Sequence, residues 1–322
     1  MKNAIDVAVG LPKDFLSVLD FTPDTLAACL DLAAGMKRAR ATGDIQPGRI
    51  LAGRHVALLF EKPSLRTRST FTIAVRELGG DVIEPPADVA LGGRESLADV
   101  ARNLERWVSA CVVRTYEQSR LAEFAASAPR MHVVNALTNE EHPCQALADM
   151  LALREQIGSL KGATLAYVGD GNNVAASLAQ AGLMLGVNVR IGSPAGYELP
   201  ADVATAARAA AVHGASLTLT NDPIEAVVGA DAVYTDVWAS MGQEAEADAR
   251  DGIFRPYQVN TPLMDAAGPQ AYFMHCLPAH RGAEVTDAVI DSARSIVFEQ
   301  AENRLHAQKA LLAMLVETPR GR

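Results

Sequence analysis

The sequence is poor in cysteine and has no long apolar run. Its four cysteines are Cys29, Cys111, Cys144 and Cys276, and none of them shows the Cys-x-x-Cys spacing of a paired metal or redox site. Reduced thiols in a cytoplasm are the simplest interpretation, and we expect no metal site. No apolar run approaches the roughly 20 residues of a membrane helix, and the N-terminal stretch lacks the apolar core of a secretion signal. These absences predict a cytoplasmic protein.

Basic residues are also fewer than acidic residues. The 322 residues include 29 Lys and Arg against 38 Asp and Glu, which gives a formal net charge of −9. An acidic surface argues against nucleic acid as a partner. The length is too great for one small core and suits two domains, while 49% apolar and 21% charged residues are ordinary for a globular protein.

Short apolar strands alternate with helical patterns along most of the chain. This alternation predicts parallel sheets with helices on both faces, and hence an α/β fold of two doubly wound parallel-sheet domains joined by long helices. The helix that begins at Pro143 marks the expected hinge. Other helices are expected at 95–108, with Trp107 on the apolar stripe, and from Glu302 to Val316. Strands are expected at 55–60, 82–83, 111–115, 132–135, 164–168, 189–191, 216–219, 232–237 and 272–276.

The first expected strand runs into F-E-K-P-S-L-R-T-R, residues 60–68. Ser64 to Thr67 therefore lie where a strand gives way to a helix N-terminus, and the free N–H groups and helix dipole there favour an anion. Two arginines and two hydroxyl residues in five positions add donors that suit phosphate. The stretch is not a Walker loop, because Gly-x-x-x-x-Gly-Lys-Ser/Thr is missing. An Arg-rich first turn on a solvated helix is the alternative.

Polar residues follow several of the other strands, and ligands of doubly wound sheets bind beyond these carboxyl ends. Arg114 ends an apolar strand, so it needs an anion, which is either a ligand phosphate or an acid such as Glu117. His142 precedes the Pro143 helix, and Gln145 lies in its first turn. A helix-capping role is the alternative for His142.

Three later strand ends carry amide, carboxylate and thiol groups. G-D-G-N-N at residues 169–173 lacks the Gly-x-Gly-x-x-Gly spacing of a dinucleotide turn, and its Asn side chains suit an amino-acid ligand. Asp236 can hold an ammonium group or serve as a turn residue. Cys276 lies between His275 and Leu277, and a thiol near cations can ionise and act on protons. A lone cysteine is, however, more often a small core residue.

Together these segments resemble the transcarbamylase family over nearly the whole chain. The resemblance rests, in chain order, on F-E-K-P-S-L-R-T-R, R-T, H-P-C-Q-A-L-A-D, G-D-G-N-N, D-V-W-A-S-M-G, H-C-L-P-A-H-R-G and E-N-R-L-H-A-Q-K-A-L-L. It implies an enzyme of arginine metabolism that transfers the carbamoyl group of carbamoyl phosphate to the δ-amine of L-ornithine, without a cofactor. It also implies a homotrimer with sites at the subunit interfaces.

The resemblance further implies one domain for each substrate and a set of site residues. Residues 1–142, with 302–322 packing back, would bind carbamoyl phosphate, and residues 143–301 would bind L-ornithine. The catalytic residues would be Arg114, His142 and Cys276. The carbamoyl phosphate residues would be Ser64, Leu65, Arg66, Thr67, Arg114, His142, Gln145, Cys276, Leu277 and Arg304. The ornithine residues would be Asn173, Asp236, Ser240 and Met241.

One position departs from the family pattern. The family usually has a Gln shortly before a G-x-K/R-E-S-like stretch, and a neighbouring subunit offers that Gln to carbamoyl phosphate. Here Ala90 stands in its place, before L-G-G-R-E-S. The sequence therefore lacks the side chain that would make the cross-subunit contact, and Arg94 is the candidate to replace it.

Other functions stay open at this point. Acetylornithine and putrescine share the amine that reacts, whereas an aspartate acceptor would need basic side chains where this sequence has Asp236. A dinucleotide-binding oxidoreductase that uses residues 169–173 is a rival from another class. A catalytically silent relative is the third possibility.

Overall fold

The computed structural model describes residues 11–43, 49–86, 91, 93–239 and 247–317. The chain divides into two compact units, which we call unit 1 (Met1–Leu147 and Asn303–Arg322) and unit 2 (Ala148–Glu302). Within the described ranges, no helix is both long enough and apolar enough to cross a membrane.

Unit 1 contains a four-stranded parallel sheet in the order β2-β1-β3-β4. Phe60 pairs with Arg114, so that β1 and β3 end side by side. The strands are β1 (His55–Phe60), β2 (Asp81–Ile83), β3 (Ala110–Arg114) and β4 (His132–Leu137). The helical elements are η2 (Val18–Asp20), α2 (Pro23–Ala41), η3 (Arg49–Leu51), α3 (Leu65–Glu77), α5 (Leu97–Leu104) and α6 (Gln118–Ser127), with parts of α7 (Pro143–Ile157) and α14 (Val297–Glu317).

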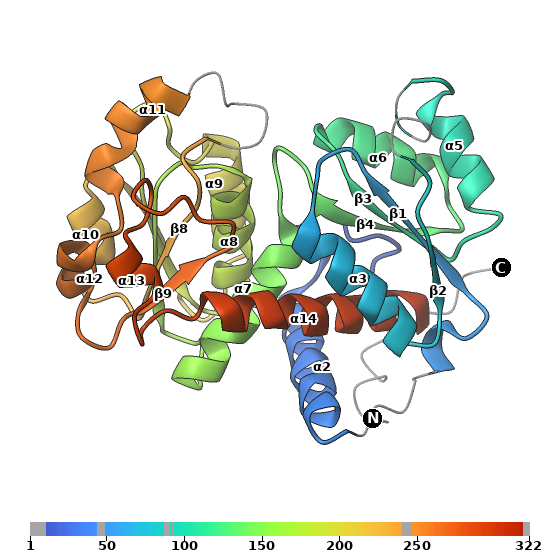
Figure 1. The fold of residues 1–322 in the computed structure, drawn as a ribbon, viewed down its shortest axis with the longest axis horizontal. Helices are drawn as coiled ribbons and strands as arrows, with labels where there is room; N and C mark the ends of the chain where they lie inside the picture. The colour runs from blue at the N-terminus through green and yellow to red at the C-terminus, as the bar shows by residue number, and fades with distance from the viewer. Residues whose placement is uncertain (1–10, 44–48, 87–90, 92, 240–246, 318–322) are drawn as a thin grey trace. The chain divides into compact units, whose positions relative to one another are not determined.

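Helices cover both faces of the unit 1 sheet (Figure 1). Successive strand residues point to opposite faces, so every second residue of β1 can enter one core. Ala57 and Leu59 do so, and they pack in one apolar cluster with Leu104 of α5 and Phe124 of α6. Figure 1 shows α3 on the opposite side of this sheet from α5 and α6.

Unit 2 contains a five-stranded parallel sheet in the order β7-β6-β5-β8-β9. The strands are β5 (Thr164–Val168), β6 (Asn188–Gly192), β7 (Leu217–Thr220), β8 (Ala232–Thr235) and β9 (Tyr272–His275). The helical elements wholly within this unit are α8 (Asn173–Met184), α9 (Ala201–Ala209), α10 (Pro223–Val227), α11 (Ala247–Phe254), η5 (Arg255–Tyr257), α12 (Thr261–Ala267) and α13 (Asp287–Ile290). In Figure 1, α8 and α9 lie on one side of this sheet and α10 and α12 on the other. The expected fold class, with two parallel-sheet α/β domains, is therefore confirmed.

Two helix predictions are wrong in detail. Trp107 is not on a buried stripe: α5 ends at Leu104, and Trp107 lies beyond it with 64% of its surface exposed. The Trp107 N–H donates to the Leu104 carbonyl in the turn that closes the helix, and this turn removes Trp107 from the helical spacing. The last helix begins at Val297 and not at Glu302.

Candidate active site

The turn between β1 and α3 presents a helix N-terminus. Ser64 precedes α3 with an extended backbone (φ −158°), and its side chain makes no capping hydrogen bond to the first turn. The N–H groups of such a turn suit a ligand, and the helix dipole favours a negative one. Thr67 is 1% exposed, whereas 77% of Leu65 is exposed. Leu65 therefore presents its backbone, and not a packed side chain, at this turn.

A buried arginine from α14 joins this turn to α7. Arg304 donates from Nη2 to the Thr67 hydroxyl at 2.9 Å, and from Nη1 to the side-chain oxygen of Gln145. Only 2% of Arg304 is exposed. A planar guanidinium held through two of its donors keeps a fixed orientation. Three predicted carbamoyl phosphate residues, which come from α3, α7 and α14, thus meet within unit 1.

Positive charge from three arginines acts on one buried histidine of unit 1. His142 is 6% exposed, and burial lowers the pKa of its imidazole well below the ordinary value of 6.5. The charges of Arg304, Arg114 and Arg66 lower this pKa further. The ring is therefore neutral at neutral pH and has one N–H to donate. Three guanidinium groups within electrostatic range of one point suit a phosphoryl group.

One further cation at the end of β1 was not among the predicted site residues. Lys62 is 6% exposed, donates to the side-chain oxygen of Asn139 at 2.7 Å, and lies 4.4 Å from the centroid of the Tyr116 ring. Burial lowers the Lys62 pKa, and the charge of Arg114 adds to that effect. The signal in the sequence was the place of Lys62 in F-E-K-P-S-L-R-T-R. Its partners lie far away along the chain, so its burial could not be predicted.

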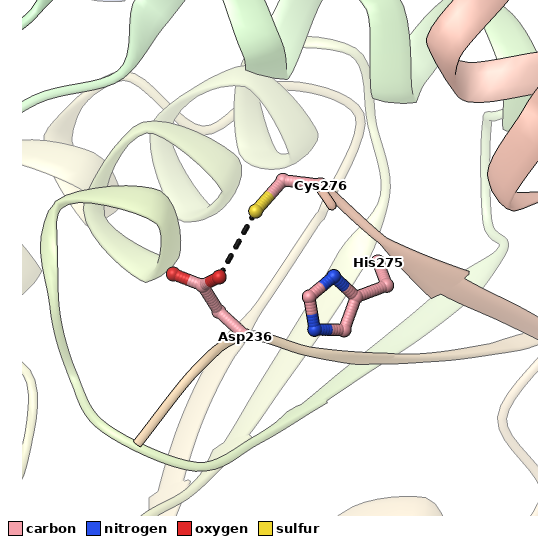
Figure 2. Close-up of side chains that lie close together, drawn as sticks. All are labelled: Asp236, His275 and Cys276. Atoms are coloured by element: carbon pink, nitrogen blue, oxygen red, sulfur yellow. Dashed lines mark hydrogen bonds between the residues drawn. The ribbon is translucent and has the colours of Figure 1, made fainter. Parts of the chain in front are cut away.

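In unit 2, two neighbouring strands bring a carboxylate and a thiol together (Figure 2). Thr235 of β8 pairs with His275 of β9, so the residues that follow them, Asp236 and Cys276, emerge side by side. The Cys276 thiol donates to Asp236 Oδ1, with 2.9 Å between sulfur and oxygen. Asp236 is 5% exposed, whereas Cys276 is partly exposed. The other three cysteines, all in described parts of the chain, are buried and free.

The His275 imidazole lies beside this pair (Figure 2), and the ligand atoms of the three residues lie within 4.8 Å of one another. That spacing suits a metal ion, but both ring nitrogens of His275 are already in use. Nδ1 accepts the N–H of Leu277 at 2.8 Å, so Nε2 carries the proton and faces Glu284 Oε1 at 3.3 Å. His275 then has no lone pair for a metal, and the trio fits amine or thiol chemistry better than a metal centre.

The remaining predicted residues of unit 2 are only partly described. Asn173 is the first residue of α8 and is half-buried. Leu277 is also half-buried and has a backbone φ of +56°, which turns the chain sharply after Cys276. Ser240 and Met241, which were predicted to bind ornithine, lie outside the described residues.

Asn172 contacts the carboxylate, although Asn173 was the residue predicted to act at this turn. Asn172 Nδ2 donates to Asp236 Oδ2 at 2.9 Å. The two asparagines are adjacent in G-D-G-N-N, so the sequence carried a signal for the turn but none for which amide faces Asp236. That distinction depends on the direction of the chain as it enters α8.

The two units offer complementary chemistry. Unit 1 holds buried positive charge at a helix N-terminus, which suits the oxygens of a phosphorylated compound. Unit 2 holds a buried carboxylate beside a thiol, which suits a cationic amine and can take part in proton transfer from it.

Two family models match the chain. Residues 13–155 match the carbamoyl-P binding domain of aspartate/ornithine carbamoyltransferase, and residues 161–315 match the Asp/Orn binding domain. An ornithine carbamoyltransferase from Parafrankia sp. is 50% identical over 308 residues, which cover 95% of this chain and 96% of that protein. A protein named "Ornithine carbamoyltransferase, anabolic", from Pyrococcus furiosus, is 48% identical over 306 residues, which cover 94% and 96%.

Solved structures share the fold as well. An ornithine carbamoyltransferase from Pyrococcus furiosus aligns with a TM-score of 0.90 at 48% identity, over 94% of this chain and 96% of that one. An ornithine carbamoyltransferase from Thermus thermophilus aligns with a TM-score of 0.85 at 42% identity, over 95% of this chain and 100% of that one. These matches confirm the family resemblance that the motifs indicated.

Proposed function

Since the chain belongs to the aspartate/ornithine carbamoyltransferase family, we propose that it transfers the carbamoyl group of carbamoyl phosphate to the δ-amine of L-ornithine, giving L-citrulline and phosphate. One observation supports an amine as the acceptor: the Cys276 thiol is hydrogen-bonded to the buried Asp236 carboxylate. A carboxylate attracts the cationic end of a diamino acid, whereas an acceptor with a second carboxylate needs basic groups there.

We assign carbamoyl phosphate to unit 1 and L-ornithine to unit 2. The names of the two family models support this division. In unit 1 the phosphoryl oxygens would bind the first turn of α3 and its arginine, and the carbamoyl oxygen would accept from Arg114 and the neutral His142. The residues proposed for this substrate in unit 1 are Ser64, Leu65, Arg66, Thr67, Arg114, His142, Gln145 and Arg304. Cys276 and Leu277, the other two residues that the resemblance implies for carbamoyl phosphate, belong to unit 2.

The chemistry needs an uncharged amine. A δ-ammonium group has an ordinary pKa of roughly 10.4, as for lysine, so it must lose a proton before its nitrogen can attack the carbonyl carbon. Asp236 and Cys276 are the groups proposed to orient that nitrogen, and the Asp236 carboxylate, which already accepts the Cys276 S–H, is proposed to take up its proton. The C–O bond to phosphate breaks as the C–N bond forms, and the arginines of unit 1 stabilise the charge of the departing phosphate. Asn173, Ser240 and Met241 are proposed to bind the rest of ornithine.

Assembly, compartment and pathway belong to the same proposal. We propose a homotrimer in the cytoplasm, acting in arginine biosynthesis. The four cysteines, all described and none of them in a disulfide, support a reducing compartment, and the word anabolic in the name of the Pyrococcus furiosus relative supports the biosynthetic direction. Light scattering on the purified protein tests the trimer, for which a mass near three times 34.1 kDa is expected.

The decisive experiment measures ureido product from carbamoyl phosphate with L-ornithine, acetylornithine, putrescine, L-lysine and L-aspartate in parallel. Strong preference for L-ornithine is expected. Preference for another amine would keep the assignment of unit 1 and overturn that of unit 2. No turnover with any amine would indicate a catalytically silent relative.

One variant in each unit tests the substrate assigned to that unit. Arg66→Ala removes a guanidinium from the first turn of α3 and should lower kcat/KM for carbamoyl phosphate by about 10²–10³-fold. Arg76→Ala, an exposed arginine in the last turn of the same helix, is the matched control and should stay near wild type. Cys276→Ser should raise the ornithine KM or lower kcat. Unchanged kinetics would make Cys276 a packing residue.

A further inference from the structure

A chain of four polar side chains leads from the interior of unit 2 to the Cys276 thiol. The Tyr167 hydroxyl donates to Asn172 Oδ1 at 3.2 Å, and Asn172 Nδ2 donates to Asp236 Oδ2 at 2.9 Å. The thiol donates to the other carboxylate oxygen, Asp236 Oδ1, at 2.9 Å. Both oxygens of this carboxylate are thus held by donors, one from the turn after β5 and one from the turn after β9.

The orientation of the Asn172 amide follows from its other contacts. Its Oδ1 accepts the N–H groups of Val174 at 3.0 Å and Ala175 at 3.2 Å, as the N-cap of α8. These donors and the Tyr167 hydroxyl face the same atom, which must therefore be oxygen. Nδ2 is left to point at Asp236. The Asn172 amide oxygen therefore caps α8, while its amide nitrogen contacts the Asp236 carboxylate.

The Tyr167 hydroxyl stays protonated and so remains a donor. The side chain is fully buried and stacked on Tyr234, with 5.8 Å between ring centroids. Burial raises the pKa of Tyr167 well above 10, and the charge of Asp236 adds to this shift. The other titratable groups near Asp236 are Tyr234, His275, Cys276 and Asp170, and Asp170 is paired with Arg250.

We propose that Asn172, supported by Tyr167, is a positioning residue that fixes the Asp236 carboxylate for the amine substrate. The inference rests on the proposed function. A carboxylate has about four lone-pair sites, so two donors from the protein fix its plane and leave sites for an incoming ammonium. A carboxylate free to rotate would present the amine in many orientations, and a small misplacement near the reacting atoms is costly to the rate.

The separate roles of the two amide ends allow the cap and the positioning to be tested apart. Serine is as good an N-cap as asparagine, but its short side chain cannot also reach Asp236. Asn172→Ser should therefore keep the thermal stability near wild type, while kcat/KM for L-ornithine falls by about 10–100-fold and KM for carbamoyl phosphate changes by less than about twofold. Asn260→Ser is the matched control: Asn260 caps α12 through the N–H of Leu263 at 3.1 Å and should leave the kinetics unchanged.

Two more variants sharpen the result. Asn172→Asp keeps a capping oxygen but sets a second carboxylate against Asp236, which disfavours ionisation of the pair. Asn172→Asp also loses the amide N–H that faces Asp236, so it should lower kcat/KM for L-ornithine as Asn172→Ser does and leave the KM for carbamoyl phosphate nearly unchanged. Tyr167→Phe removes only the hydroxyl. It should lower kcat/KM for L-ornithine as Asn172→Ser does, but by a smaller factor.

Alkylation of Cys276 by iodoacetamide gives a readout that needs no turnover. The thiol donates to Asp236, so its alkylation rate, followed by mass spectrometry of the intact protein, should differ between wild type and Asn172→Ser but not between wild type and Asn260→Ser. A wild-type protein that makes no ureido product would refute the proposed function, while this rate still tests the positioning. Equal alkylation rates and equal ornithine kinetics in Asn172→Ser and Asn260→Ser would overturn the inference.

Discussion

At the scale of single residues, the neutral state of His142 has a consequence for stability. The unfolded chain takes up a proton at this histidine below about pH 6.5, whereas the folded chain does not, because burial and three arginines lower the folded pKa. The unfolded state thus binds more protons as the pH falls. The stability linked to His142 is fully present above that pH and is lost as the pH falls through 6.5 toward the folded pKa.

His142→Asn should therefore flatten the loss of unfolding free energy between about pH 6.5 and pH 5, since asparagine takes up no proton in this range. Urea unfolding at half-unit pH steps measures the slope in both proteins. Parallel curves for wild type and variant would show that His142 does not contribute to the acid sensitivity.

Gly171 is required by a close approach of two backbones. A Cβ at this position would lie 2.3 Å from the Leu199 nitrogen and 2.4 Å from the Glu198 carbonyl carbon. Gly171→Ala should displace the turn that carries Asn172, raise the KM for L-ornithine, and destabilise the fold by about 1–3 kcal/mol. Kinetics with both substrates and urea unfolding measure these effects.

Gly252→Ala is the matched control for Gly171→Ala. Gly252 lies within α11, and nothing would lie within 4 Å of a new Cβ there. Alanine in a helix interior should leave the kinetics unchanged and add about 0.5–1 kcal/mol of stability. Equal effects of the two substitutions would contradict the steric explanation for Gly171.

At the scale of secondary structure elements, α14 supplies Arg304 to the candidate carbamoyl phosphate site, where two nitrogens of its guanidinium donate to Thr67 and Gln145. Lysine keeps the charge at this position but has a single nitrogen, which cannot face Thr67 and Gln145 in the same planar arrangement. Arg304→Lys should raise the KM for carbamoyl phosphate by about tenfold and leave the KM for L-ornithine nearly unchanged. Lys309→Arg on the same helix keeps the ion pair with Glu77 and should behave as wild type. Steady-state kinetics with both substrates measure the difference, and a wild-type KM in Arg304→Lys would show that charge alone suffices.

The elements that the sequence predicted best are the buried strands. The bounds of β1 and β5 agree to the residue, because both are apolar runs that end in polar turns. The helix predicted at 95–108 was wrong at Trp107. Apolar residues can continue at helical spacing in a sequence after the helix itself has ended, as α5 does at Leu104. Such an end depends on local hydrogen bonds that residue spacing does not encode.

The same limit applies to the candidate site. Cys144 and Cys276 both lie in polar motifs, yet Cys144 is fully buried, and burial raises the pKa of its thiol to about 12. Cys276 instead reaches Asp236 across the β8–β9 edge. Strand order decides which strand ends are neighbours, and the sequence gives the strands without their order. The family resemblance supplied what the spacing could not.

At the scale of the whole molecule, the family pattern predicts that a neighbouring subunit completes the carbamoyl phosphate site. The family's Gln is Ala90 here, which lies outside the described residues, and Arg94 is exposed. Ala90→Gln should lower the KM for carbamoyl phosphate if the contact is missing, since an added amide donor reaches the substrate, while the KM for L-ornithine stays the same.

If Arg94 already supplies the contact, Arg94→Ala should raise the KM for carbamoyl phosphate, and Ala90→Gln should restore it in the double variant. Steady-state kinetics on the assembled protein separate these cases. No change in either single variant would mean that neither position reaches carbamoyl phosphate, and that each subunit binds it with its own residues.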